Sequence, residues 1–270
     1  MALRVLERAR YGNLVTVAAV KDYLRITAST DDAVLAVLAD SVSRLFESEI
    51  GRPLARQRYA VTFPLSERLR LLLTACPVDP DLVTVEIDGT ADSDFSVEDD
   101  ATGVLYRAGR WNGPDGWRED GEHLVEVTYT GGYVSPDAVQ TWATGLTLSA
   151  GQWLRPTTSS SAYTGQLLYQ VTTAGATGSG SEPTWPTTAG QTIAAGTATV
   201  TARTAEIVPA SLQALALYAV QVLHQGRSRE AGMTKLDADG FSASWAAEVS
   251  AAAGLPEAVC KALASWRFQG

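Results

Sequence analysis

Apolar positions follow a helical repeat at both ends of the chain and a strand-like pattern between them. Near the N-terminus, Val17, Val20 and Leu24 recur at helical spacing, and Thr16 can cap the first turn. We therefore predict a short amphipathic helix over VTVAAVKDYLRI.

Residues 29–54 carry the strongest helical pattern of the chain. Ser29 and Asp32 have the spacing of a capping box, which predicts the start of a helix, and Gly51 predicts its end. The predicted apolar stripe consists of Val34, Leu38, Val42, Leu45 and Phe46.

Strand patterns replace the helical repeat in residues 56–133. Six segments alternate or are rich in β-branched residues, and turn residues such as DG separate them: RYAVTF, RLRLLL, VTVEI, FSV, GVLYR and LVEVTYTGGY. Between Asp79 and Asp100 lie nine acidic residues and no basic one. These acids lack the glycine and the spacing of an EF-hand loop, so solvated acidic turns are favoured over a calcium site, and we predict no metal.

Composition changes again between Ala138 and Thr204, where only Arg155, Glu182 and Arg203 are charged. Threonine and glycine dominate, and short apolar runs alternate with turns, which predicts a small all-β unit. Helical spacing returns in IVPASLQALALYAVQVLHQGR, with Pro209 at the first position, and again in the terminal GLPEAVCKALASWRFQG.

These patterns predict an α+β fold: a helical bundle of about four helices with an antiparallel β region, plus a small all-β inserted domain. The predicted outer domain is discontinuous and comprises 1–137 and 206–270, with the insert at 138–205. Residues 227–245 have weak periodicity and several charges, and we predict that they are mobile in the free subunit and become ordered on assembly.

Three outer segments, taken in order, resemble the head-to-tail connector (adaptor) proteins of tailed bacteriophages. They are the first helix pair, the VEVTYTGGY strand leading to VPASLQALALYAVQVLHQGR, and the closing LPEAVCKALASWRF. The resemblance covers 15–137 and 206–268, most of the chain. One departure is that about seventy residues separate TGGY from VPASL, where the family generally has a short link.

The resemblance implies a virion protein at the head-to-tail junction, made in the host cytoplasm. It implies a ring of about twelve copies beneath the portal protein that provides the platform for the next neck or stopper protein. Family subunits dock on the portal through the C-terminal segment, which makes Trp266, Arg267 and Phe268 the portal-docking candidates. Trp266 could equally be the last core residue of its helix.

The insert is similar to a small β module that recurs in phage virion proteins, and AGATGSGSEPTWP carries this likeness. Two interpretations remain open for Trp153, Tyr169 and Trp185. They could form a sugar-stacking surface, which would make the chain a carbohydrate-binding decoration module, or they could form the core that a domain of this size needs. The core interpretation is favoured.

Charge and chemistry narrow the function further. A net charge of −9 argues against a sequence-reading DNA-binding protein but suits a wall past which double-stranded DNA slides. Cys76 and Cys260 match no metal spacing; they could form one disulfide, but two buried free thiols are favoured. The isolated His123 and His224 suggest no catalytic arrangement. We therefore expect no enzyme activity, no cofactor, no secretion signal and no membrane association.

Overall fold

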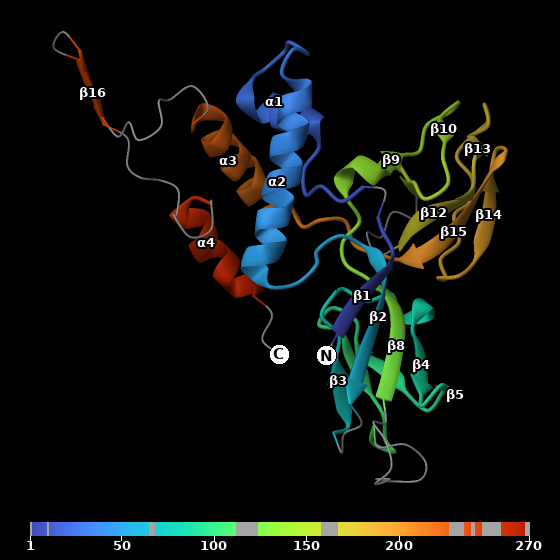
Figure 1. The fold of residues 1–270 in the computed structure, drawn as a ribbon. Helices are drawn as coiled ribbons and strands as arrows, with labels where there is room; N and C mark the ends of the chain where they lie inside the picture. Colours follow the sequence, from blue (N-terminus) through green and yellow to red (C-terminus); the bar gives the residue numbers. More distant parts are fainter. Residues whose placement is uncertain are drawn as a thin grey trace. The chain divides into compact units, whose positions relative to one another are not determined.

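The chain forms two compact units with mixed α and β structure in a computed structural model (Figure 1). The structure describes residues 2–9, 11–64, 68–111, 124–157, 167–226, 235–238, 241–244 and 255–267. The strand unit consists of Met1–Tyr11 and Pro53–Ile207, and the helical unit consists of Gly12–Arg52 and Val208–Gly270. None of the described helices is both long enough and apolar enough to cross a membrane.

Four α-helices from distant parts of the sequence make up the helical unit. They are α1 (Val17–Leu24), α2 (Asp32–Ile50), α3 (Ala210–Gly226) and α4 (Glu257–Leu263), followed by the 3-10 turn η3 (Ala264–Trp266). Helix α2 packs against the other three, and α1 also contacts α3. Each predicted helix is therefore present, while the finer prediction of a bundle stays a prediction.

The start of α1 is confirmed and the start of α2 is corrected. Thr16 Oγ1 accepts a hydrogen bond of 2.9 Å from the backbone N–H of Ala19, as a helix cap does. The capping box predicted for Ser29 and Asp32 is wrong, because Asp31 occupies the cap position without a side-chain hydrogen bond. Asp32 instead binds Lys21 Nζ of α1 at 2.8 Å. Its carboxylate is therefore used to join two helices.

The buried face of α2 lies beside the predicted stripe. Val42 and Phe46 are buried as predicted, whereas Val34, Leu38 and Leu45 are half-exposed. The buried residues of the helix are Leu35, Ala39, Val42, Ser43, Phe46 and Ile50. A hydrophobicity pattern misses this face, since it contains two small residues, Ala39 and Ser43.

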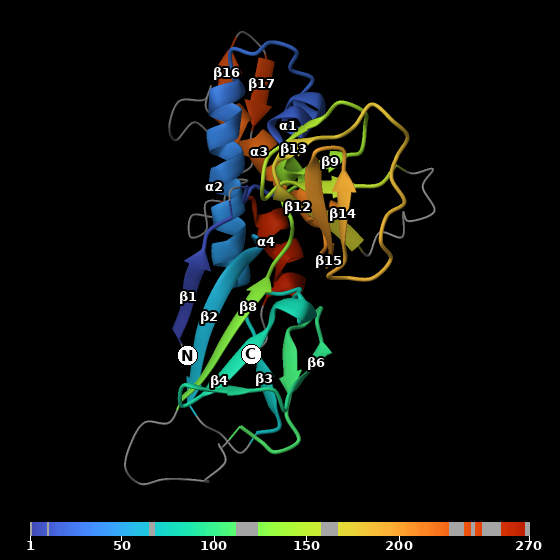
Figure 2. The same ribbon diagram turned by 90° about the vertical axis from the view of Figure 1, so that its right-hand side faces the viewer.

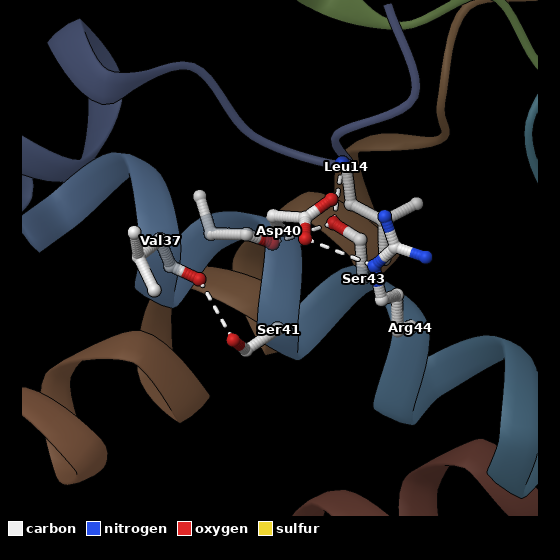
Figure 3. A network of polar contacts seen from close by, with 7 residues as sticks. Leu14, Val37, Asp40, Ser41, Ser43 and Arg44 are labelled. Carbon is white, nitrogen blue, oxygen red and sulfur yellow. Dashed lines mark hydrogen bonds and ion pairs between the residues drawn. The ribbon is translucent and has the colours of Figure 1, made fainter. Parts of the chain in front are cut away.

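Ser43 is buried because both of its hydrogen-bonding functions are satisfied (Figure 3). Its hydroxyl donates to the carbonyl of Ala39 at 2.7 Å and accepts the backbone N–H of Leu14 at 3.0 Å. The second bond fixes the segment that precedes α1 onto α2. On the solvent side of the same helix, Arg44 binds Asp40 at 2.9 Å.

The strand unit contains a five-stranded antiparallel sheet with the order β1-β2-β8-β4-β5. Its strands are β1 (Ala2–Glu7), β2 (Gln57–Pro64), β8 (Leu124–Gly131), β4 (Thr84–Ile87) and β5 (Thr90–Asp92). A second sheet has the order β3-β7-β6, from β3 (Arg70–Leu72), β7 (Val104–Tyr106) and β6 (Ser96–Asp99) (Figure 2). All six strand segments predicted in residues 56–133 fall on these elements, while β1 and β5 were not predicted.

Alternate residues of the two sheets form one apolar core. It includes Tyr59, Val61, Leu73, Leu105, Trp111, Val125, Val127 and Tyr129, each with at most 1% of its surface exposed. The glycine pair of TGGY closes the end of this core. A Cβ on Gly131 would stand 2.0 Å from the carbonyl oxygen of Ala75, and Gly132 has a φ of 100° beside the carbonyl of Ala55. Both positions therefore require glycine.

The segment predicted as an insert consists of strands. A five-stranded sheet has the order β14-β15-β12-β11-β9, and a two-stranded sheet pairs β10 with β13. Their bounds are β9 (Val139–Thr141), β10 (Thr147–Leu148), β11 (Trp153–Arg155), β12 (Leu167–Thr173), β13 (Gly175–Ala176), β14 (Thr192–Ala195) and β15 (Ala198–Thr204). Strands β9 and β11 are parallel, and the other pairs are antiparallel.

Entry to and exit from this segment lie side by side. The N–H of Val134 donates to the carbonyl of Glu206 at 2.7 Å, and Val134 forms a parallel bridge with Ile207. A small core of Val134, Ala138, Trp153, Leu168 and Ala205 connects the two parts. The contacts thus group residues 138–205 with the strand region, whereas the predicted division placed that region with the helices.

Three short elements complete the description. Two are the 3-10 turns η1 (Pro80–Leu82) and η2 (Pro136–Ala138), and the third is a hairpin of β16 (Lys235–Ala238) and β17 (Phe241–Ser244). This hairpin falls within residues 227–245, which were predicted to be mobile, and the rest of that segment lies outside the described residues.

Candidate assembly surfaces

The C-terminal segment separates into a buried helix and an exposed end. Leu255, Val259 and Leu263 are fully buried, as their spacing predicts. Trp266 follows in η3 and is only half-buried, and Arg267 is exposed. Phe268, the third docking candidate, lies outside the described residues. Part of the Trp266 side chain therefore remains accessible to a partner.

Arg267 has a partner within its own chain. Its guanidinium forms an ion pair with the carboxylate of Glu49 near the end of α2. The Glu49 side chain is 16% exposed and that of Arg267 is 54% exposed, so the pair lies at the edge of the helical unit. This contact connects the C-terminal segment to α2.

The three aromatic residues proposed as a sugar surface are buried. Trp153 is 6% exposed, Tyr169 0% and Trp185 3%. The rings of Tyr169 and Trp185 pack against each other with centroids 4.4 Å apart. Buried rings present little surface to a sugar, so this burial favours the core interpretation of the three residues over the glycan one.

Glu182 holds the SEPTWP turn through hydrogen bonds to its side chain. Its carboxylate accepts hydrogen bonds from the backbone N–H of Thr157 (2.9 Å), the Thr157 hydroxyl (2.5 Å) and Trp185 Nε1 (2.7 Å). The Tyr169 hydroxyl donates to the carbonyl of Pro186 at 2.7 Å. Burial disfavours ionisation of Glu182, but these hydrogen bonds outweigh it and lower its pKa.

A buried ion pair that the sequence pattern did not indicate lies where β2 begins. Arg56 binds Asp79 at 2.5 Å, with side-chain exposures of 6% and 0%. The guanidinium stands over the ring of Trp153, 5.3 Å from its centroid. Burial lowers the pKa of Arg56 and raises that of Asp79, while each partner favours the charged form of the other.

Arg56 also lines a groove of about 720 Å³ within the strand unit. Trp153 and the charged residues Glu7, Arg8, Arg58 and Asp81 line it as well. Thr84, Thr128 and Thr130 also line the groove. No run of neighbouring residues in the sequence signals this groove, because it is assembled from several separate segments.

The acidic stretch 79–100 has structural partners. Asp79 pairs with Arg56, Asp92 binds Arg107 at 2.7 Å, and Glu98 binds Arg70. Asp99 accepts the backbone N–H groups of Ala101 and Thr102 and so closes a turn. These carboxylates fix loops and strands of the two sheets.

Both cysteines are free thiols, as predicted. Cys76 is also buried as predicted, whereas Cys260 is only half-buried. Of the two histidines, His224 lies in the last turn of α3, and His123 lies outside the described residues.

Comparisons with known proteins give partial likenesses to phage-like particles. No family model and no curated protein matches the chain. Among solved structures, the neck of an empty gene transfer agent (GTA) particle is similar at 18% identity, with a TM-score of 0.38, over 50% of this chain and 72% of that chain. The virion of the native GTA particle is similar at 16% identity, with a TM-score of 0.38, over 50% and 73%.

Proposed function

We propose that the chain is a structural virion protein, the head-to-tail connector (adaptor) that forms a ring beneath the portal of a phage or phage-like particle. In this role it acts by assembly. The ring of about twelve copies docks on the portal protein, and its other side receives the next neck or stopper protein.

One observation carries this proposal: the three segments that resemble the adaptor family fall on the elements that the resemblance implies. The first segment forms α1 and α2. The second consists of β8 with the glycine pair that follows it, and of α3. The third forms α4. These helices form one unit although about 160 residues separate the end of α2 from the start of α3. Residues 135–205, which separate the two halves of the second segment, begin and end beside the hydrogen-bonded Val134 and Glu206. A short link could join these two residues, as in the family.

The proposed portal contact uses the C-terminal segment. Trp266 offers a half-exposed aromatic surface and Arg267 an exposed guanidinium, which are residue types common at the centres of interfaces. The proposed inner wall needs no basic face, since a chain with a net charge of −9 lets DNA pass without adsorbing it.

The test is quantitative mass spectrometry of purified particles from the source, with copies of this chain counted against the portal protein. A ratio near one supports the adaptor ring. Absence of the chain from mature particles would sink the proposal.

A further inference from the structure

The five-stranded sheet ends in two edges that pair with no described strand, β1 on one side and β5 on the other. Unpaired backbone N–H and C=O groups at such edges are templates for pairing with another chain. On β1, Val5 and Leu6 are 41% and 42% exposed, and on β5, Thr90 and Ala91 are exposed. Both edges therefore combine free backbone with accessible side chains.

The strand register fixes which parts of the two edges lie at the same height. Leu3, Val61, Val127, Val85 and Asp92 form one continuous row across all five strands. Arg4 follows Leu3 on β1, and Ser93 and Asp94 follow Asp92 after β5. In a ring whose axis runs along the strands, a neighbouring copy would present Asp92 one residue from the height of Arg4. Asp94 follows in the turn where its N–H donates to Asp92 Oδ1 at 3.1 Å.

The two edges differ in charge. Arg4 and Arg8 are exposed at the β1 edge, where Glu7 is the one acid of the strand. At the β5 edge Asp88 and Asp94 are exposed, while Asp92 is already neutralised by Arg107. Arg4 reaches Glu126 of its own sheet only at 3.5 Å, with both side chains well exposed, so little is lost when it turns to another carboxylate.

From these edges we propose that β1 of one copy pairs with β5 of a second copy, so that the sheets join edge to edge around the ring. The inference rests on the proposed ring and names its subunit contact. A basic edge that meets an acidic edge is a heterologous contact, the type that can close a ring, whereas β1 against β1 is an isologous contact that stops at a dimer. Within a sheet β1 and β5 run in the same direction, because successive neighbours alternate. Rotation about an axis along the strands preserves that direction, and the contact is therefore parallel.

Charge reversal of the full chain tests the contact by native mass spectrometry and light scattering. Arg4→Glu and Asp94→Arg should each raise the concentration needed for ring formation about tenfold or more, and the double variant should restore it. Glu86→Arg is the matched control, since Glu86 is exposed on β4 and one strand away from the edge. This control should assemble like the wild type.

A cysteine pair gives a second readout. In a Cys260→Ser background, Arg4→Cys with Asp94→Cys should yield covalent multimers up to the closed ring, and either cysteine alone should not. Rings that form normally in both charge-reversal variants would overturn the edge contact but leave the ring standing. Dimers linked through Arg4→Cys alone would also overturn it. A wild-type chain that stays monomeric at every concentration would overturn the proposed ring and this contact together.

Discussion

The single residues with the clearest expected effect on stability are Arg56 and Asp79, whose paired side chains are 6% and 0% exposed. Removing one partner from such a pair leaves an uncompensated charge in a site with little water, which typically costs about 3–5 kcal/mol. Asp79→Asn should therefore lower the free energy of unfolding by about that amount in urea titrations. Arg56→Met combined with Asp79→Leu should lose less than Asp79→Asn alone.

Glu98→Gln provides the comparison for this prediction, because Glu98 pairs with Arg70 on the exposed surface. It should change the unfolding free energy little. If Asp79→Asn were as mild as Glu98→Gln, the Arg56 charge would have found water or another partner.

Glu182 predicts a pH dependence of stability. Its pKa is lowered in the folded chain, so its ionised form stabilises the fold above the unfolded pKa of about 4.3. That contribution disappears as the pH falls through the lower folded value. The melting temperature of Glu182→Gln should thus lie below that of the wild type at neutral pH, and the difference should shrink below about pH 4. A difference that is constant from neutral to acidic pH would mean that the charge of Glu182 is not what stabilises the SEPTWP turn.

Among the elements, the C-terminal segment allows its contribution to stability and the proposed portal docking to be tested separately. Leu263→Ala removes a fully buried side chain and should cost about 2–5 kcal/mol in unfolding free energy. Trp266→Ala should cost less, because Trp266 is half-buried, yet it should weaken binding to the portal protein more strongly. Equilibrium unfolding and a pull-down with portal rings measure the two effects. Equal loss of portal binding in a Leu263→Ala variant that remains folded would count against a specific role of Trp266.

Sequence patterns predicted strands and helices well where the residue types themselves carry the signal. The alternation of VEVTYTG matches the alternating burial of β8, and Thr16 caps α1 as its chemistry suggests. The pattern failed where tertiary contacts decide. Ser43 looks like a surface residue of α2 but is buried by two hydrogen bonds, and β1 is a strand because β2 pairs with it.

The candidate surfaces were less predictable than the elements for the same reason. Arg56 and Asp79 are 23 residues apart, and Trp153, which covers the guanidinium, is further still. Nothing in their local sequences marks them as partners. The aromatic residues of the segment 138–205 were visible in the sequence, but only burial distinguishes a core from a sugar-binding face.

At the scale of the whole molecule, excision of the segment 138–205 tests how far the strand unit depends on it. Val134 and Glu206 are already hydrogen-bonded, so a short glycine-serine link between Asp137 and Glu206 can close the gap. The helices and the core around Tyr59 should remain folded. The excision removes Trp153 from above Arg56 and Leu168 from against Val134, so the melting temperature of the strand unit should fall.

Circular dichroism and calorimetry measure this outcome, and hydrogen exchange locates it. Faster exchange should concentrate in residues 54–58 and 131–135, beside the removed contacts, while α2 and α3 keep their protection. A variant that unfolds completely would show that residues 138–205 are an integral part of the strand unit. One that is as stable as the wild type would make the segment an independent decoration, attached only through its two ends.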